Sequence, residues 1–80
     1  MKAHVLVRPK EGILDPQGEA VKGSLEKLGF PVSRVRVGRV IDLELEVASE
    51  EVARAEVARM CDQLLANALI ESFEITVDPA

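Results

Sequence analysis

"VSRVRVGRVIDLELEV", residues 32–47, is the stretch of this chain that decides its fold. Its odd-numbered positions are mostly apolar and its even-numbered positions are mostly charged, on both sides of Gly38. Alternation with a period of two is typical of a β-strand that buries one face. A two-residue hairpin loop at Gly38-Arg39 would spread the apolar residues over both faces, and a three-residue loop would put Val40 in a left-handed conformation that disfavours valine. The pattern therefore favours one long strand, bent or bulged at Gly38, over a hairpin.

A strand of this length is too long for a small domain to cover. About 15 residues at ~3.3 Å each extend nearly ~50 Å. The simplest partner for the uncovered part is a second copy of the chain. Two copies paired antiparallel about Val40 would bring Arg36 opposite Glu44, and a register one step away would bring Arg36 opposite Asp42. We therefore predict a homodimer, or a tetramer, whose self-association residues are Arg34, Val35, Arg36, Val37, Gly38, Arg39, Val40, Leu43, Glu44, Leu45 and Glu46.

Shorter elements flank this strand on both sides. Residues 2–8 alternate as a strand, residues 16–28 form an amphipathic helix, a second helix runs from about residue 50 to residue 67, and residues 72–77 form a last strand. The order β-α-β(long)-α-β predicts an α+β fold, in which a mostly antiparallel sheet carries two helices on one face, related to the ferredoxin-like sandwich. We expect residues 1–80 to form a single domain and the sheet to extend across the homodimer.

Capping signals mark the helix ends. Asp15 suits the N-cap of the first helix and Gly29 suits a left-handed C-terminal end, whereas Asn67 is expected to end the second helix in the left-handed region. Two glycines inside the first helix, Gly18 and Gly23, are either tolerated imperfections or points at which another backbone approaches closely. The apolar stripe of the second helix comprises Ala53, Val57, Met60, Cys61, Leu64 and Ala68.

Composition restricts the classes of function. With 80 residues, no Trp or Tyr and two Phe, the chain builds a thin core, so self-association is an expected source of extra stability. The net charge of −4 argues against nucleic acid as a partner. The N-terminal residues lack the apolar length of a signal peptide, and no apolar run approaches a membrane span. We therefore expect a cytoplasmic protein with no membrane partner.

Side chains that could carry out chemistry are few. We interpret His4, the only histidine, as a surface or interface imidazole, and Cys61 as a buried small hydrophobe rather than a nucleophile. Asp42, Glu44 and Glu46 alternate on one strand face, a spacing that a divalent ion could use but that is more often a solvated or paired face. The sequence contains no glycine-rich phosphate loop. These residues predict no catalytic, cofactor-binding or metal site and favour a protein that acts through its surfaces.

Several blocks of sequence carry a resemblance to a known family. They are "RPKEGILDPQGEAV", "LGF" followed by "VRVGR", "LELEV", and "CDQLLANALIESFEI". Together, over essentially the whole chain, they resemble the PurS family, the small subunits of phosphoribosylformylglycinamidine synthase in bacteria and archaea. Ala68 stands where the family pattern has proline, a departure that concerns only the turn into the last strand.

The resemblance implies a non-catalytic subunit in de novo purine biosynthesis. In this family a glutaminase subunit releases ammonia, and a large synthetase subunit uses ATP to convert formylglycinamide ribonucleotide into formylglycinamidine ribonucleotide. The whole enzyme is thus a C–N ligase with glutamine as its amide donor. The small subunit is expected to bridge these two partners, as a dimer or tetramer, and to help form the ammonia passage. It would bind no cofactor itself, since ATP, Mg²⁺ and glutamine are used by the partner subunits.

With this resemblance, the start of the first helix becomes a predicted partner-docking site. A helix N-terminus presents free N–H groups and partial positive charge, which can receive a carboxylate or carbonyl group of another protein. The docking residues would be Lys10, Asp15, Pro16, Gln17 and Gly18. Two other classes stay open as alternatives. One is a dimeric regulatory module that senses small metabolites in a polar pocket at the dimer seam, and the other is a small isomerase that uses His4.

Overall fold

A computed structural model describes residues 1–78 of the chain as three strands and two α-helices in the predicted order. The elements are β1 (Lys2–Pro9), α1 (Pro16–Lys27), β2 (Arg39–Glu44), α2 (Glu50–Met60), the π-helical turn η1 (Cys61–Leu65) and β3 (Glu71–Asp78). The strands form one antiparallel sheet in the order β2-β1-β3. The predicted α+β class is therefore confirmed. No helix within residues 1–78 is long and apolar enough to cross a membrane.

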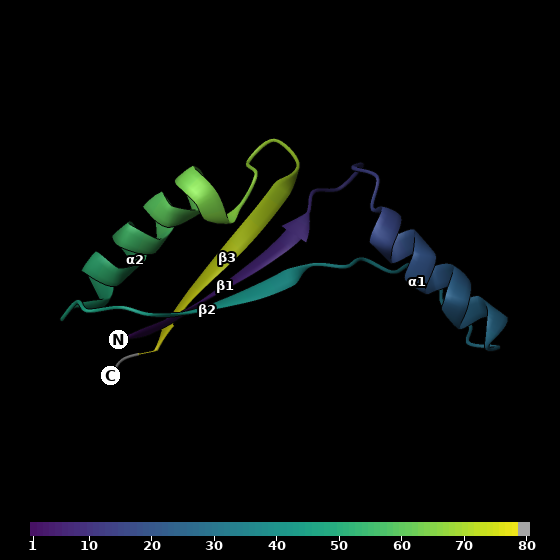
Figure 1. Cartoon of the computed structure of the whole chain (residues 1–80), viewed down its shortest axis with the longest axis horizontal. Coiled ribbons are helices and arrows are strands. Elements are labelled where there is room, and N and C mark those ends of the chain that lie inside the picture. Colours follow the sequence, from purple (N-terminus) through teal and green to yellow (C-terminus); the bar gives the residue numbers. More distant parts are fainter. Residues whose placement is uncertain (79–80) are drawn as a thin grey trace.

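The core lies between the sheet and α2, which runs across one face of the sheet (Figure 1). The central strand β1 alternates as predicted, with one set of side chains fully buried and the other set, which includes His4 and Leu6, on the opposite face. The buried residues are small, mostly valine and alanine, which gives the thin core that the composition indicates. They are Ala3, Val5, Val7, Ala53, Val57, Cys61 and Val77.

Two antiparallel neighbours flank β1 in fixed registers. β1 pairs with β2 as far as Val7, which lies opposite Arg39. It pairs with β3 as far as Pro9, which lies opposite Glu71. β2 is thus an edge strand, and no other strand of residues 1–78 lies along its outer edge.

The predicted long strand is one extended segment, but only part of it is paired. Residues 31–38 run from the end of α1 into β2 without doubling back, so the alternative hairpin at Gly38 does not form (Figure 1). Apolar half-buried positions and charged exposed positions alternate over residues 35–37 and again over residues 41–47 with the same parity, and the alternation is interrupted at the exposed residues Gly38, Arg39 and Val40. The ladder is shorter than predicted because its pairing with β1 ends where Val7 lies opposite Arg39, and no other strand of the described chain lies beside the segment ahead of Arg39. A Cβ atom on Gly38 would collide with the carbonyl oxygen of Val7, which explains the glycine where the segment leaves the sheet.

α1 begins and ends as predicted but does not pack on the sheet of its own chain. Asp15 caps the helix, and Gly29 ends it with a φ of 94°. The Phe30 amide donates to the Leu25 carbonyl over 3.0 Å, as in a Schellman-type end. The helix lies beyond the end of the sheet (Figure 1), and Gly18 is its only buried residue. Within the single chain, α2 alone therefore covers the face predicted to carry two helices, because the extended segment and the loop after β1 place α1 away from the sheet.

The end of α2 differs from the prediction. The helix continues into η1, where the Ala66 amide donates to the carbonyl of Cys61 over 3.2 Å, and the chain becomes extended at Ala66. Asn67 does not end the helix in the left-handed region, since every positive φ within residues 1–78 belongs to a glycine. The wider π turn changes the direction of the side chains that follow. As a result Leu64 is 83% exposed instead of completing the apolar stripe, and Ala68 lies outside the helix.

The chain is elongated for its length. Its radius of gyration is 15.8 Å and its extents are 49 × 26 × 14 Å, whereas a compact chain of this size would have a radius of gyration of ~12 Å. The sheet and α2 occupy one end of the molecule, and α1 occupies the other (Figure 1). Apolar side chains are left uncovered on α1, just after it and on β2. Val21 is 41% exposed, Phe30 54%, Val40 61% and Leu28 73%.

Candidate association surfaces

Asp15 ties the start of α1 to the extended segment. Its Oδ1 accepts a hydrogen bond from the Gly18 amide over 3.0 Å, and its Oδ2 accepts one from the Val37 amide over 2.8 Å. These bonds, chiefly the one from Val37, hold the pKa of the Asp15 carboxyl below its ordinary value. Both carboxylate oxygens are therefore engaged within the chain. Asp15 thus joins the start of α1 to the extended segment, and its predicted role in docking stays a prediction.

Gly18 lets the extended segment approach the first turn of α1. A Cβ atom at this position would collide with the carbonyl oxygen of Val35 and with the Asp15 carboxylate. Of the two interpretations of Gly18, the structure supports the close approach of another part of the backbone, here the carbonyl group of Val35. By contrast, a Cβ atom on Gly23 would meet nothing within 4 Å in this chain.

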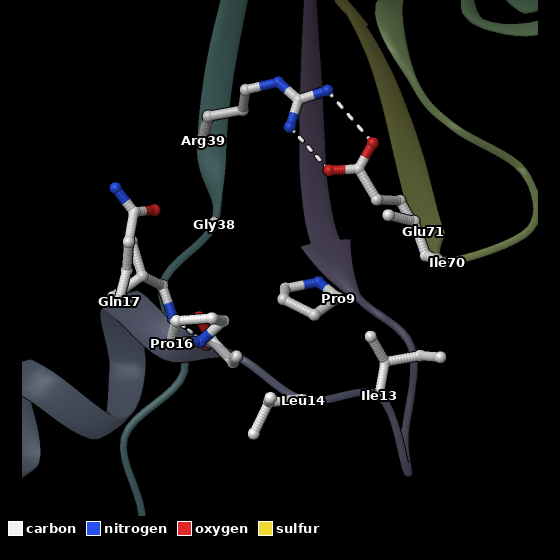
Figure 2. Close-up of a pocket in the computed structure, with 11 residues that line it drawn as sticks. Pro9, Ile13, Leu14, Pro16, Gln17, Gly38, Arg39, Ile70 and Glu71 are labelled. Carbon is white, nitrogen blue, oxygen red and sulfur yellow. Dashed lines mark hydrogen bonds and ion pairs between the residues drawn. The ribbon is translucent and has the colours of Figure 1, made fainter.

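A hollow of about 350 Å³ opens between the loop after β1, the start of α1 and the start of β3 (Figure 2). Two of the predicted docking residues, Pro16 and Gln17, line it and are exposed. Lys10 is not among its lining residues, because its ammonium group donates to the carbonyl oxygen of Ala68 over 2.6 Å. We call this region the junction hollow. Its apolar lining comprises Pro9, Ile13, Leu14, Pro16, Val37 and Ile70.

Arg39 borders the junction hollow through a two-point contact with Glu71 (Figure 2). Its Nη1 and Nη2 lie 2.6 Å and 3.1 Å from the two carboxylate oxygens, and Nη2 also donates to the carbonyl of Leu65 over 2.6 Å. Hydrogen bonds from Arg39 and from the Asn67 amide lower the pKa of Glu71. The sequence predicts Arg39 as a self-association residue. In the structure its guanidinium joins β2 to β3 and to η1 of the same chain.

The charged self-association residues lie along one extended strand. Arg34 lies 2.6 Å from Glu11, whereas Arg36 lies 3.6 Å from the same carboxylate and donates to the carbonyl of Pro9. Glu44 and Glu46 are exposed and make no ion pair within residues 1–78. Arg34 and Arg36 therefore precede Gly38, and Glu44 and Glu46 follow it. Within the single chain these arginines make no ion pair with these two glutamates. The apolar members Val35, Val37, Leu43 and Leu45 are half-buried.

His4 is held between two carboxylates on the sheet face opposite α2. Its Nδ1 lies 2.6 Å from an Asp42 oxygen and its Nε2 lies 2.8 Å from an Asp78 oxygen. Hydrogen bonds to Asp42 and Asp78 raise the pKa of His4 above its ordinary value. A carboxylate accepts hydrogen bonds, so this geometry favours the protonated imidazole, in which both ring nitrogens donate. Both ring nitrogens are engaged by Asp42 and Asp78, which leaves neither of them free to receive a proton from another group.

The only thiol is equally unsuited to chemistry. Cys61 is fully buried, and burial raises the pKa of its thiol, whereas a nucleophilic cysteine needs a lowered one. Across residues 1–78, no group of His, Cys, Asp and Glu side chains could hold a metal ion.

Two of these hydrogen bonds could not be predicted from the sequence. The bond from the Val37 amide to Asp15 spans 22 residues, and the bond between His4 and Asp78 spans 74. A partial signal for the second is that His4 and Asp42 both fall at outward-facing strand positions. Only the register of β1 against its neighbours places these side chains side by side.

Comparison with known proteins gives a consistent result over almost the whole chain. Residues 2–79 match the family model described as "PurS: Phosphoribosylformylglycinamidine (FGAM) synthase". The phosphoribosylformylglycinamidine synthase subunit PurS of Synechocystis sp. is 47% identical over 78 residues, which cover 94% of this chain and 76% of that protein.

Solved structures agree with the sequence comparison. Methanocaldococcus jannaschii PurS, described as one of the subunits of formylglycinamide ribonucleotide amidotransferase in the purine biosynthetic pathway, superposes with a TM-score of 0.88 at 39% identity, covering 99% of this chain and 96% of that one. A chain in the structure of PurLQS from Thermotoga maritima superposes with a TM-score of 0.85 at 34% identity, covering 94% of this chain and 93% of that one.

Proposed function

The chain belongs to the PurS family of phosphoribosylformylglycinamidine synthase, and from this premise we propose that it serves as the non-catalytic small subunit of that enzyme in purine biosynthesis. The observation that carries the proposal is the family match over residues 2–79. The similarity to a chain of PurLQS supports a place in a larger complex. A cytoplasmic location stays a prediction from the sequence.

In this proposal the chemistry belongs to partner subunits. A glutaminase subunit releases ammonia and a large synthetase subunit uses ATP, Mg²⁺ and glutamine-derived ammonia, while this chain bridges the two and helps to enclose the ammonia path. The states of the two candidate reactive groups support this division of labour. Cys61 is buried with a raised thiol pKa, and both ring nitrogens of His4 are hydrogen-bonded to carboxylates.

Reconstitution with the glutaminase and synthetase subunits of the same cell tests the function. Formation of formylglycinamidine ribonucleotide should require this chain when glutamine is the nitrogen donor. The same reaction driven by ammonium salt should proceed without it, because the synthetase then needs no delivered ammonia. Full glutamine-dependent activity in the absence of this chain would contradict the proposal. A pull-down of the tagged chain from its own cell extract, with glutamine and ADP present, should recover both partners.

Self-association with a second copy is part of the same proposal. Residues 31–38 and α1 project beyond the sheet of their own chain, and the Val21 and Leu28 side chains of α1 remain exposed. On the sheet, α2 contacts β3, and the β2 side of that face keeps Ile41 and Leu43 only half-buried. The α1 helix of a second copy would supply the second helix of that face, which agrees with the predicted ferredoxin-like arrangement.

Sedimentation of the purified protein tests self-association directly. We expect a dimer, or a tetramer built from dimers, at micromolar concentration, because the apolar surface of α1 and the β2 edge are uncovered in the single chain. A monomer at that concentration contradicts this part of the proposal and leaves the family membership untouched.

The junction hollow is the docking site that we assign to a partner subunit. Asp15, Pro16 and Gln17 line it, and Pro16 and Gln17 are exposed. Lys10 and Gly18 are not among its lining residues, and each contacts its own chain instead. A Gln17→Glu variant should weaken capture of the partners, because it places a charge at the rim of an apolar hollow. Glu19→Gln, an exposed change in the same helical turn, is the matched control. Equal capture by both variants would show that the partners dock elsewhere.

A further inference from the structure

A second hollow, of about 350 Å³, opens on the face of the sheet opposite α2. Its charged lining residues are all arginines, although the chain has 14 acidic and 10 basic residues. We propose that this region, which we call the arginine hollow, binds a small-molecule phosphate monoester. The phosphate would lie between Arg8 and Arg36, and the carbon body of the ligand would lie on Leu6 and Val40. The six lining residues are Leu6, Arg8, Arg36, Gly38, Arg39 and Val40.

The apolar part of the arginine hollow is a cross-strand pair. Leu6 of β1 lies opposite Val40 of β2, and residues directly opposite each other share one face of a sheet. That face is the one away from α2, because Leu6 alternates with the buried residues Val5 and Val7. Val40 is 61% exposed, so its apolar surface is available for contact. A volume of about 350 Å³ falls within the range of small-ligand sites, ~300–1,000 Å³.

Gly38 brings the two arginines to the same hollow. A Cβ atom on Gly38 would lie 3.3 Å from Cγ of Arg8, so the stem of the Arg8 side chain lies against this glycine. Arg36 precedes Gly38 by two positions and donates a hydrogen bond to the carbonyl oxygen of Pro9, the residue that follows Arg8. Because Gly38 has no side chain, the space that both arginines line stays open.

Arg8 and Arg36 are only loosely paired with carboxylates of their own chain. Nη1 of Arg8 lies 3.8 Å from a Glu74 oxygen, and Nη1 of Arg36 lies 3.6 Å from a Glu11 oxygen. Both distances exceed the length of a hydrogen bond. Exposed ion pairs contribute little to stability, so an incoming anion can replace these contacts at small cost.

Two loosely paired cations favour a doubly charged ligand. Arg39 is already bound to Glu71 at 2.6 Å, so its guanidinium does not compete for a ligand. A phosphate monoester carries close to two negative charges at neutral pH and offers three acceptor oxygens. Arginine can bind a phosphate through two parallel N–H donors. A carboxylate carries a single charge and would leave either Arg8 or Arg36 without a counter-ion.

Isothermal titration calorimetry of the purified full chain measures the binding. The site is built from one chain, so the measurement depends on neither the partner subunits nor self-association. The probe is phenyl phosphate, which combines a phosphate dianion with an apolar ring. Benzoate has the same ring but a single charge, and it should bind at least about tenfold more weakly. Inorganic phosphate has the charge but no carbon body, and it should also bind more weakly than phenyl phosphate.

The outcomes of this titration separate the two parts of the proposal. Absence of phenyl phosphate binding, or equal affinity for benzoate, overturns the phosphate site. Equal affinity for inorganic phosphate overturns the role of Leu6 and Val40 in holding the ligand body. Neither result bears on the family membership or on the proposed subunit function.

Substitutions locate the site on the chain. Arg8→Gln and Arg36→Gln should each weaken phenyl phosphate binding by at least about tenfold, because each removes a charged donor group from the phosphate. Arg59→Gln removes the same charge from an exposed position of α2 and should stay within about twofold of the original affinity. Equal affinities of the Arg8→Gln and Arg59→Gln chains would overturn the assignment.

NMR spectra of the isotopically labelled chain supply a readout that does not depend on substitutions. Phenyl phosphate should shift the amide signals of Leu6, Gly38 and Val40, which surround the hollow, and leave those of α2 unchanged. Shifts confined to α2, or to the junction hollow, would place the ligand elsewhere and overturn the proposal.

Discussion

Single polar side chains hold distant parts of this chain together. Asp15 bonds both to the first turn of α1 and to the extended segment, and His4 bonds to both strands that flank β1. Each of these groups uses two hydrogen-bonding atoms on two different elements. Such bridging groups fix the relative positions of elements that share few apolar contacts.

His4 should make the stability of the sheet depend on pH. Its two hydrogen bonds raise its pKa above the ordinary value of 6.5. Its contribution is therefore fully present below the unfolded pKa and is lost as the pH rises through the higher folded pKa. The free energy of unfolding in urea should fall from about pH 6 to about pH 9 by more in the original chain than in His4→Gln. Because His4 is the only histidine, its NMR titration gives the folded pKa directly, and a midpoint at or below 6.5 would contradict the expectation.

The two glycines inside α1 should respond oppositely to alanine. Gly18→Ala would place a Cβ atom against the Val35 carbonyl and the Asp15 carboxylate, and we expect it to destabilise the protein by ~1–3 kcal/mol. Gly23→Ala meets open space and should stabilise the helix by up to ~1 kcal/mol, because alanine is the better helix former. Thermal or urea unfolding of the two variants measures both effects. Equal effects of the two changes would show that the segment does not approach α1 at Gly18.

Two elements are incomplete at the scale of secondary structure. β2 has a free outer edge, and such edges invite pairing with another strand. α1 has well-formed ends but buries only Gly18 in its own chain. Isolated helices of this length are marginal in water, so α1 needs a surface to pack against.

The apolar face of α1 should matter for association rather than for folding of the single chain. Val21 is 41% exposed in the monomer, so Val21→Asp should leave the sheet and α2 intact. If α1 covers a second copy, the same change buries a charge and should weaken the dimer by at least about tenfold. Glu26→Gln, on an exposed position of the same helix, is the control. Sedimentation of the two variants distinguishes the outcomes, and an unchanged dimer for Val21→Asp would mean that α1 faces solvent.

The whole molecule is open because its core is small. The buried apolar residues of the core lie in β1, β3, α2 and η1, and the molecule is 49 Å long. A core of this size stabilises a folded chain only marginally. Assembly with further chains, as proposed above, would therefore add stability to the folded chain.

Unfolding should accordingly depend on protein concentration. When folding and dimerisation are coupled, mass action raises the apparent stability as concentration increases. We expect Tm to rise between about 1 µM and about 100 µM chain, and to rise less for Val21→Asp, whose dimer is weaker. Differential scanning fluorimetry with an added dye, or circular dichroism, measures this shift. A Tm independent of concentration would indicate that the single chain is stable alone.

The sequence by itself determined the local features of this protein. Helix ends at Asp15 and Gly29, the buried face of β1 and the alternation over residues 41–47 depend on neighbours within a few positions, so they can be predicted from periodicity and capping residues. The blocks that resemble PurS were likewise readable in the linear sequence. The π turn at Cys61–Leu65 was not, because no residue pattern marked it.

Only the tertiary structure decided where α1 lies, which partners Asp15 and His4 have, and which carboxylates on β2 remain free. Each of these depends on contacts between residues 22 to 74 positions apart. Such contacts are set by the order of the strands and their registers against β1, and a pattern with a period of two constrains register only to within two residues. The contact between His4 and Asp42 is of this kind, since only the register of β1 against β2 brings these two side chains together.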